Sequence, residues 1–148
     1  MRLRFIFALV VGSVLGPHAF AQGLSDETVA DVLKDFSEYC VDERERQELS
    51  DPDSADVILK PGAITSYSTD HGPVTILDAG SMRCESGGYG YCGVSKCTAW
   101  LFHSGKSQAY LGTLVVQDSG SDLQVLLCEG PDPYLDHCRK IDLDVFRR

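Results

Sequence analysis

The residues with most chemical potential lie between Cys84 and Cys97, in the run C-E-S-G-G-Y-G-Y-C-G-V-S-K-C. Three of the six cysteines and four of the fourteen glycines fall there. Thiols can form disulfides, bind metals or act as nucleophiles. The sequence contains no C-x-x-C pair, and the intervals of seven and four residues differ from those of zinc ribbons and fingers. We therefore expect disulfides here.

The first 21 residues have the features of a secretory signal peptide. Arg2 and Arg4 precede an apolar run over residues 5–15, and Ala19-Phe20-Ala21 provides a small-x-small cleavage site. The run is too short for a membrane anchor, which takes about 20 apolar residues. We expect cleavage after Ala21, leaving residues 22–148 as one periplasmic or secreted domain. An even number of cysteines behind such a leader predicts three disulfides.

Six cysteines allow fifteen pairings, so the connectivity is a hypothesis. We expect a short ring closed by one pair, a second pair around the proline-containing loop 129–136, and a third that tethers the N-terminal region over 44 positions. That last crosslink should contribute most, about 4 kcal/mol by loss of denatured-state entropy. The expected pairs are Cys92–Cys97, Cys128–Cys138 and Cys40–Cys84. If Cys84 pairs with one of its close neighbours instead, Cys40 bonds to Cys92 or Cys97.

The spacing Gly88-x-Gly90-x-x-Gly93 matches the dinucleotide-binding fingerprint literally. That chemistry needs a strand before the glycines and a helix after them, so that the pyrophosphate meets a helix N-terminus. Here a cysteine and then the strand-like run 98–102 follow. We therefore expect no cofactor, and we assign the glycines to tight chain reversal between crosslinked cysteines.

Catalytic residues are not predicted. The part of the chain after residue 21 holds His71, His103 and His137, and nothing in their spacing brings them together for acid–base work. The sequence contains neither G-x-S-x-G nor H-E-x-x-H. Asp70 and Asp78 are weak candidates for metal ligands.

The charge of the chain limits its partners. The full chain carries −9, and removal of Arg2 and Arg4 with the leader leaves 11 basic and 22 acidic residues, or −11. So acidic a surface disfavours nucleic acid and anionic lipid. It allows a cationic protein partner or divalent metals, and we expect no membrane insertion.

The N-terminal region predicts an amphipathic helix. Ser25 is a suitable N-cap, and Asp26 and Glu27 would lie in a first turn where acids are favoured. Apolar residues then recur at helical spacing, at Val29, Val32, Leu33, Phe36, Tyr39 and Cys40. We expect this stripe to pack on the protein's own sheet rather than on a partner.

The remainder predicts short strands separated by turns, with no alternation of strands and helices. The fold class is therefore α+β: an N-terminal amphipathic helix on an antiparallel sheet of about five short strands, braced by three disulfides. The segment 123–128 has two apolar faces and should be central, and 141–145 alternates as a last strand with one wet face. The expected strands are 57–59, 63–67, 74–77, 98–102, 109–116, 123–128 and 141–145.

The stretch from Ile76 to Phe102 resembles a group of small secreted bacterial proteins with no assigned activity. Their pattern is V-V-D-x-S-x-x-C, then F-C-G-T-G-G-C before a strand; here the chain has I-L-D-A-G-S-M-R-C and later C-G-V-S-K-C. The resemblance implies architecture and compartment only. The group's acidic loop, D-x-N-G-D-G-x-x-D, is reduced to S-T-D-H-G-P, so a calcium site in that loop would keep only Asp70 and Asp78.

Three functions remain open. The first is a non-enzymatic periplasmic or secreted interaction module that binds a protein partner. One version of it is an inhibitor of a basic cell-wall-degrading enzyme of the lysozyme type, because S-G-K-S-Q-A-Y at Ser104–Tyr110 is similar, at a different spacing, to the S-G-x-x-Y loop of such inhibitors. The second is a small secreted hydrolase using histidines or carboxylates, and the third is a divalent-metal-binding envelope protein.

Overall fold

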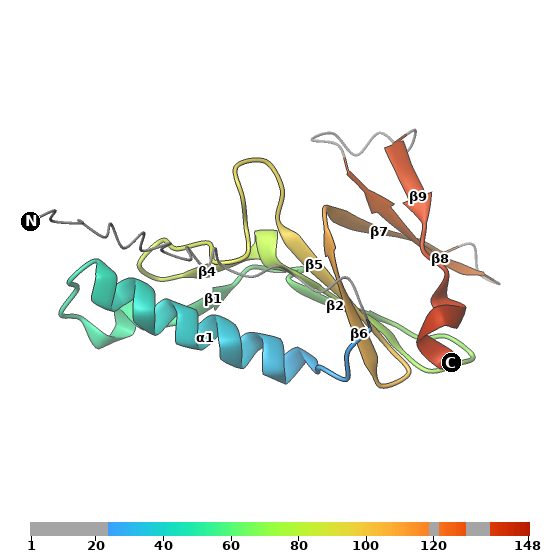
Figure 1. Ribbon diagram of the computed structural model, residues 1–148, viewed down its shortest axis with the longest axis horizontal. Coiled ribbons are helices and arrows are strands. Elements are labelled where there is room, and N and C mark those ends of the chain that lie inside the picture. Colours follow the sequence, from blue (N-terminus) through green and yellow to red (C-terminus); the bar gives the residue numbers. More distant parts are fainter. Residues whose placement is uncertain (1–23, 119–121, 130–136) are drawn as a thin grey trace, which may run out of the picture.

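The computed structural model describes residues 24–118, 122–129 and 137–148 (Figure 1). The predicted signal peptide, residues 1–21, lies outside this part, as do positions 119–121 of one predicted turn and nearly all of the loop 129–136. Among the helices of the described ranges, none is both long and apolar enough to cross a membrane.

The single α-helix of the described chain, α1 (Val29–Arg46), begins later than expected. Thr28 is the N-cap: its Oγ1 accepts the Asp31 N–H at 3.3 Å, and Asp31 Oδ2 accepts the Thr28 N–H at 2.8 Å. This reciprocal capping box satisfies two otherwise free donors. Ser25, the predicted cap, instead forms an isolated antiparallel bridge with Ser107, through N···O bonds of 2.9 and 2.7 Å.

The nine strands of the described residues form three antiparallel sheets rather than one sheet of about five, within the predicted α+β class. A four-stranded sheet has the order β2-β3-β5-β6, a three-stranded sheet has the order β7-β8-β9, and β1 pairs with β4. The bounds are β1 (Val57–Leu59), β2 (Ile64–Tyr67), β3 (Val74–Asp78), β4 (Met82–Cys84), β5 (Thr98–His103), β6 (Lys106–Leu111), β7 (Thr113–Asp118), β8 (Leu123–Cys128) and β9 (Cys138–Lys140). Short 3-10 helices are η1 (Pro52–Ala55), η2 (Ala79–Ser81) and η4 (Leu143–Arg147).

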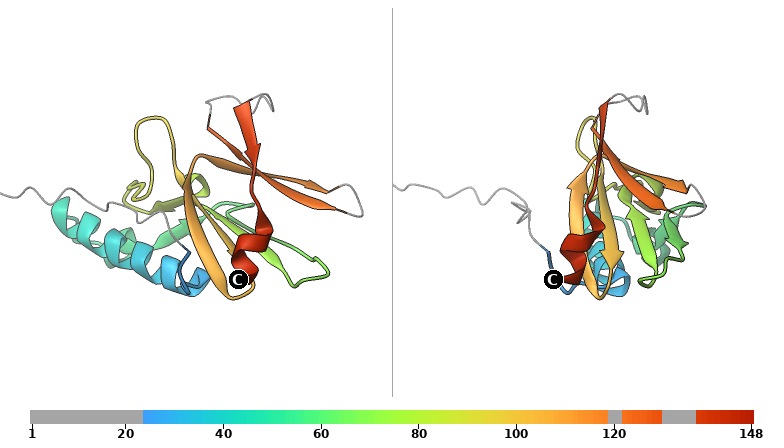
Figure 2. Two further views of the ribbon diagram at one scale, coloured as in Figure 1. Left: turned by 45° about the vertical axis from the view of Figure 1, so that its right-hand side comes forward. Right: turned by 90° about the vertical axis from the view of Figure 1, so that its right-hand side faces the viewer.

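The four-stranded sheet is covered on both faces. Helix α1 packs on one face through Val32 and Phe36, which share a core cluster with Trp100 and Phe102 of β5. The β7-β8-β9 sheet and η4 cover the other face, in a second cluster that includes Leu101. Figures 1 and 2 show α1 and the β7-β8-β9 sheet on opposite sides of the molecule. Every residue of β5 is buried, because alternate side chains enter different cores.

Two strand predictions are wrong for tertiary reasons. The expected strand 109–116 is interrupted at Gly112, whose φ is +143° and where an added Cβ would lie 2.7 Å from the Cys128 carbonyl oxygen. The chain therefore leaves one sheet as β6 and enters another as β7. The expected strand 141–145 is largely the 3-10 helix η4, capped by Asp142 and anchored by the buried Phe146. The expectation that 123–128 is central is confirmed by its position between β7 and β9.

Candidate functional site

The six cysteines form three disulfides, and these are the pairs expected from the sequence. Cys40–Cys84 is buried and joins α1 to β4, while Cys128–Cys138 links directly opposite residues of β8 and β9. The third, Cys92–Cys97, closes a short hairpin before β5 and is partly exposed. No cysteine thiol is therefore free to act as a nucleophile or a metal ligand.

The glycine-rich segment before this hairpin lies against α1. A Cβ added to Gly90 would lie 2.7 Å from Cδ1 of Tyr39, and one added to Gly88 would lie 3.0 Å from Cγ of Glu43. Both glycines thus permit close approach to the helix, while Gly87, at φ +93°, makes the reversal expected from the sequence. Strand β5 follows the glycines, so the dinucleotide fingerprint lacks its helix.

The hairpin from Cys92 to Cys97 is fixed at its base. Within it, the Gly93 N–H donates to the Lys96 carbonyl at 2.8 Å. Just outside it, the Thr98 N–H donates to the Tyr91 carbonyl at 2.9 Å. The Tyr91 ring packs edge-on against Trp100, with centroids 4.8 Å apart. The loop before β5 extends away from the sheet (Figures 1 and 2). The hairpin therefore has a base held by the disulfide and hydrogen bonds, and a tip that projects from the molecule.

The tip of this hairpin exposes apolar surface. Val94 is fully exposed and Leu111, at the end of β6, is 59% exposed; these are the two most exposed large apolar side chains of the described chain. A backbone hydrogen bond links the hairpin to the chain just after β6, because the N–H of Gly112 donates to the Cys97 carbonyl at 3.0 Å. A groove of about 380 Å³ separates the hairpin from the β6–β7 corner. Its lining comprises Asp78, Gly80, residues 93–97, Gly112 and Thr113.

The two candidate metal ligands do not share a site. Asp70 lies in the turn before β3 and Asp78 at its far end, so the strand Val74–Asp78 separates them. The carboxylate of Asp78 caps η2: it accepts the Gly80 N–H at 3.0 Å and the Ser81 hydroxyl at 2.9 Å. Across the described ranges, no group of three or more potential ligands could hold a metal ion.

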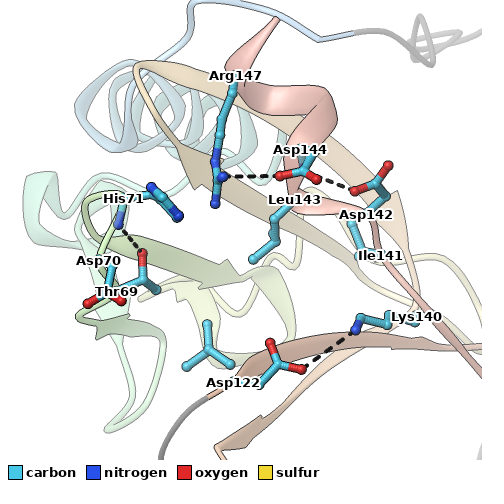
Figure 3. Close-up of a pocket in the computed structure, with 11 residues that line it drawn as sticks. Thr69, Asp70, His71, Asp122, Lys140, Ile141, Asp142, Leu143, Asp144 and Arg147 are labelled. Atoms are coloured by element: carbon cyan, nitrogen blue, oxygen red, sulfur yellow. Dashed lines mark hydrogen bonds and ion pairs between the residues drawn. The ribbon is translucent and has the colours of Figure 1, made fainter.

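Asp70 lines a polar cleft of about 310 Å³ between the β2–β3 turn, β8 and η4 (Figure 3). Two ion pairs lie in its lining. Lys140 lies 3.9 Å from Asp122, and Arg147 lies 3.1 Å from Asp144. The remaining acid of η4, Asp142, accepts the Asp144 N–H. The cleft keeps an excess of negative charge, because four aspartates line it against one lysine and one arginine.

The structure brings two histidines to one cleft, which the sequence did not suggest. His71 and His103 both line an apolar cleft of about 450 Å³, whereas His137 is exposed beside β9. His103 is only 2% exposed, and its Nδ1 lies 3.1 Å from the Pro73 carbonyl oxygen. Donation to that carbonyl requires a proton on Nδ1. Its Nε2 is buried and finds no partner among the described residues. His103 is therefore part of the cleft wall, with one ring nitrogen bound to the backbone and the other buried.

Comparison with known proteins adds no identification: no protein family, curated protein or solved structure matches the chain. The sequence located the hairpin through its cysteines but missed the exposure of Val94 and Leu111. No signal in the sequence marks either residue, because valine and leucine are ordinarily expected in cores.

Proposed function

We propose that this protein is a non-enzymatic interaction module of the periplasm or cell exterior, which binds a protein partner through the hairpin Cys92–Cys97 and the adjoining groove. The observation that carries the proposal is the full exposure of Val94 at the tip of a disulfide-closed loop. A valine gains about 1.5–3 kcal/mol on full burial. A partner with an apolar pocket could supply that burial.

The rigidity of the hairpin supports the proposal. Binding must offset the entropy of ordering loops and side chains at the interface. Here the disulfide and the Gly93–Lys96 hydrogen bond already restrict the loop, and Tyr91 fixes its base against Trp100. Valine itself has few rotamers to lose. A preorganised apolar tip beside a groove is the arrangement expected of an interface anchor.

Charge favours a cationic partner. The chain carries 22 acidic and 13 basic residues. Attraction to a basic protein would speed encounter and weaken as salt is raised. An inhibitor of a basic cell-wall-degrading enzyme remains one form of this proposal. However, Tyr110 of the motif that suggested it lies in β6, is largely buried and donates to Gln108, so that segment does not support it.

The test is site-specific photocrosslinking of the disulfide-bonded protein in its own cells. A photoreactive phenylalanine analogue at Val94 should give a covalent product with one partner, and the same analogue at Leu49 should not. Leu49 is a matched control because it is also an exposed apolar residue, 39% exposed, beyond the far end of α1. The substitution V94D should abolish capture of that partner, and L49D should not. Absence of a product at position 94, or capture unaffected by V94D, would contradict the proposal.

A hydrolase and a metal-binding protein have less support. The hydrolase hypothesis relied on histidines or carboxylates; His71 and His103 line one cleft, but His103 is 2% exposed and its Nδ1 lies against the Pro73 carbonyl oxygen. The metal hypothesis relied on Asp70 and Asp78, which lie at opposite ends of β3. The resemblance to small secreted bacterial proteins bears on architecture and compartment, and on no activity.

A further inference from the structure

The apolar cleft of about 450 Å³ lies between the start of α1 and one end of the four-stranded sheet. Three segments surround it: residues 27–30 at the start of α1, the turn 71–73 before β3, and the β5–β6 turn 104–106. Phe102 and Thr75, neighbours across β5 and β3, also line it. This cleft is separate from the groove proposed above to bind protein, and none of its lining residues is shared with that groove.

The size and lining of this cleft fit a small molecule. Its volume falls within the roughly 300–1,000 Å³ typical of ligand sites, which are mostly apolar with a few polar groups. Val29, Pro73 and Phe102 supply apolar surface. His103 contributes to the wall; its Nδ1 is bound to the Pro73 carbonyl, and its buried Nε2 has no hydrogen-bond partner among the described residues.

The charges at the cleft favour a cation. Glu27 lines it, and burial together with nearby Asp35 and Asp31 raises the pKa of this carboxyl. Lys106 also lines the cleft, and its Nζ donates to the carbonyl oxygen of Arg148 at 2.6 Å. The positive end of the α1 dipole amounts to about half a charge. The carboxylate of Glu27 lines the cleft, and Asp31 and Asp35 act on it from outside the lining, so negative charge exceeds that half charge.

We infer that this cleft binds a small amphiphilic amine, with its apolar part against Phe102 and Pro73 and its ammonium group at Glu27. The apolar part gains by leaving water. The ammonium relieves the repulsion among Glu27, Asp31 and Asp35. An anion of the same shape meets those carboxylates instead and is rejected, so the cleft selects by charge.

The test uses three probes of similar shape: phenethylamine, 3-phenylpropionate and 2-phenylethanol. They are titrated into the ¹⁵N-labelled, disulfide-bonded protein while amide chemical shifts are recorded. Gly72 and Gly105 line the cleft and serve as reporters. We expect saturable shifts at these two glycines with the amine, weaker binding of the alcohol and none of the carboxylate.

Two variants and one control complete the experiment. E27Q should weaken amine binding about two- to fivefold, the range of a partly exposed ion pair. E38Q removes an acid from an exposed face of the same helix and should leave binding unchanged. A30F places a ring at an exposed cleft position and should weaken binding at least tenfold. If A30F misfolds, the amide chemical shifts of the unmodified protein still show whether the amine binds in this cleft. Equal binding of the carboxylate, shifts confined to other sites, or no saturable shift with the amine would overturn the inference.

Discussion

The close approach of the glycine-rich segment to α1 makes Gly90→Ala a sensitive test of the fold. The added Cβ would lie 2.7, 2.8 and 3.0 Å from Cδ1, Cε1 and Cγ of Tyr39. Because Cγ is among these atoms, rotation of the ring about its own axis cannot relieve the contact. The whole side chain must move by about 1 Å to restore an ordinary carbon–carbon separation. That movement is opposed by the stacking of Tyr39 on Phe36, with centroids 5.7 Å apart.

The expected magnitude follows from two opposing terms. Overpacking of this kind costs about 1–3 kcal/mol. Replacement of glycine by alanine also restricts the unfolded chain, which stabilises by about 0.4–1 kcal/mol where the backbone is compatible. Gly90 is outside the left-handed region, so this gain applies. We expect a net loss of about 0.5–2 kcal/mol for Gly90→Ala.

Gly93→Ala is the matched control. It lies three residues away, also outside the left-handed region, and its added Cβ would meet only the Lys96 carbonyl oxygen at 3.7 Å, an ordinary contact. It should be neutral or stabilising. In a Tyr39→Ala background the ring is absent, and Gly90→Ala should then lose its penalty, which gives a coupling energy of about 1 kcal/mol or more.

The assay is equilibrium urea unfolding of the oxidised protein, followed by Trp100 fluorescence and by far-ultraviolet circular dichroism. If the transitions recorded by the two probes coincide, unfolding can be treated as two-state and a free energy of unfolding can be derived. Two results would contradict this prediction: equal midpoints for Gly90→Ala and Gly93→Ala, or a Gly90→Ala that remains equally destabilising without the Tyr39 ring. Either result would mean that the segment does not lie against α1 as described.

Two further predictions concern the disulfides and pH. Replacement of both Cys40 and Cys84 by alanine should lower the free energy of unfolding by about 4 kcal/mol, and replacement of Cys92 and Cys97 by about 2 kcal/mol. The difference arises because the first disulfide closes a loop of 44 positions and the second a loop of 5. Equal losses in denaturant unfolding would contradict this entropic ranking. Hydrogen bonds from Arg46 and Gln47 lower the pKa of Glu43 below its ordinary 4.5. Its contribution to stability is therefore present above pH 4.5 and lost as the pH falls through the lowered folded-state value. Glu43→Gln should be less stable than the parent at pH 7 and nearly equal to it at the acid end, and a gap that does not change with pH would refute this.

The sequence predicted features that depend on local order. The apolar spacing from Val29 to Cys40 placed the helix and the face that it buries, and most β-rich runs became strands. The sequence predicted the ends of these elements less accurately. Ser25 and Thr28 are both good caps, but only Thr28 has a reciprocal partner at Asp31, and Ser25 is taken by Ser107, 82 positions away. The alternation at 141–145 misled because the buried anchor, Phe146, lies just beyond it.

The sequence predicted the position of the candidate site but not which of its residues are exposed. Cys92 and Cys97 marked the hairpin, since six cysteines behind a predicted leader favour disulfides and these two are only five positions apart. Which apolar residue would remain outside was not visible, because exposure depends on what packs nearby. None of the residues that the structure describes covers Val94, and Leu111 ends a strand where Gly112 turns the chain into another sheet. The sequence also did not predict the apolar cleft, because its walls come from three segments that are distant in the chain, at positions 27–30, 71–75 and 102–106.

By itself, the sequence determined the helix, the strand-forming runs, the acidic charge and the expectation of covalent bracing, all of which follow from composition and from periodicities of two and 3.6 residues. Only the tertiary structure decided that the strands divide into three sheets, that glycines serve contact with Tyr39, and that an apolar tip is left uncovered. These features depend on which distant surfaces meet. Such meetings are set by packing across the whole chain rather than by any local pattern.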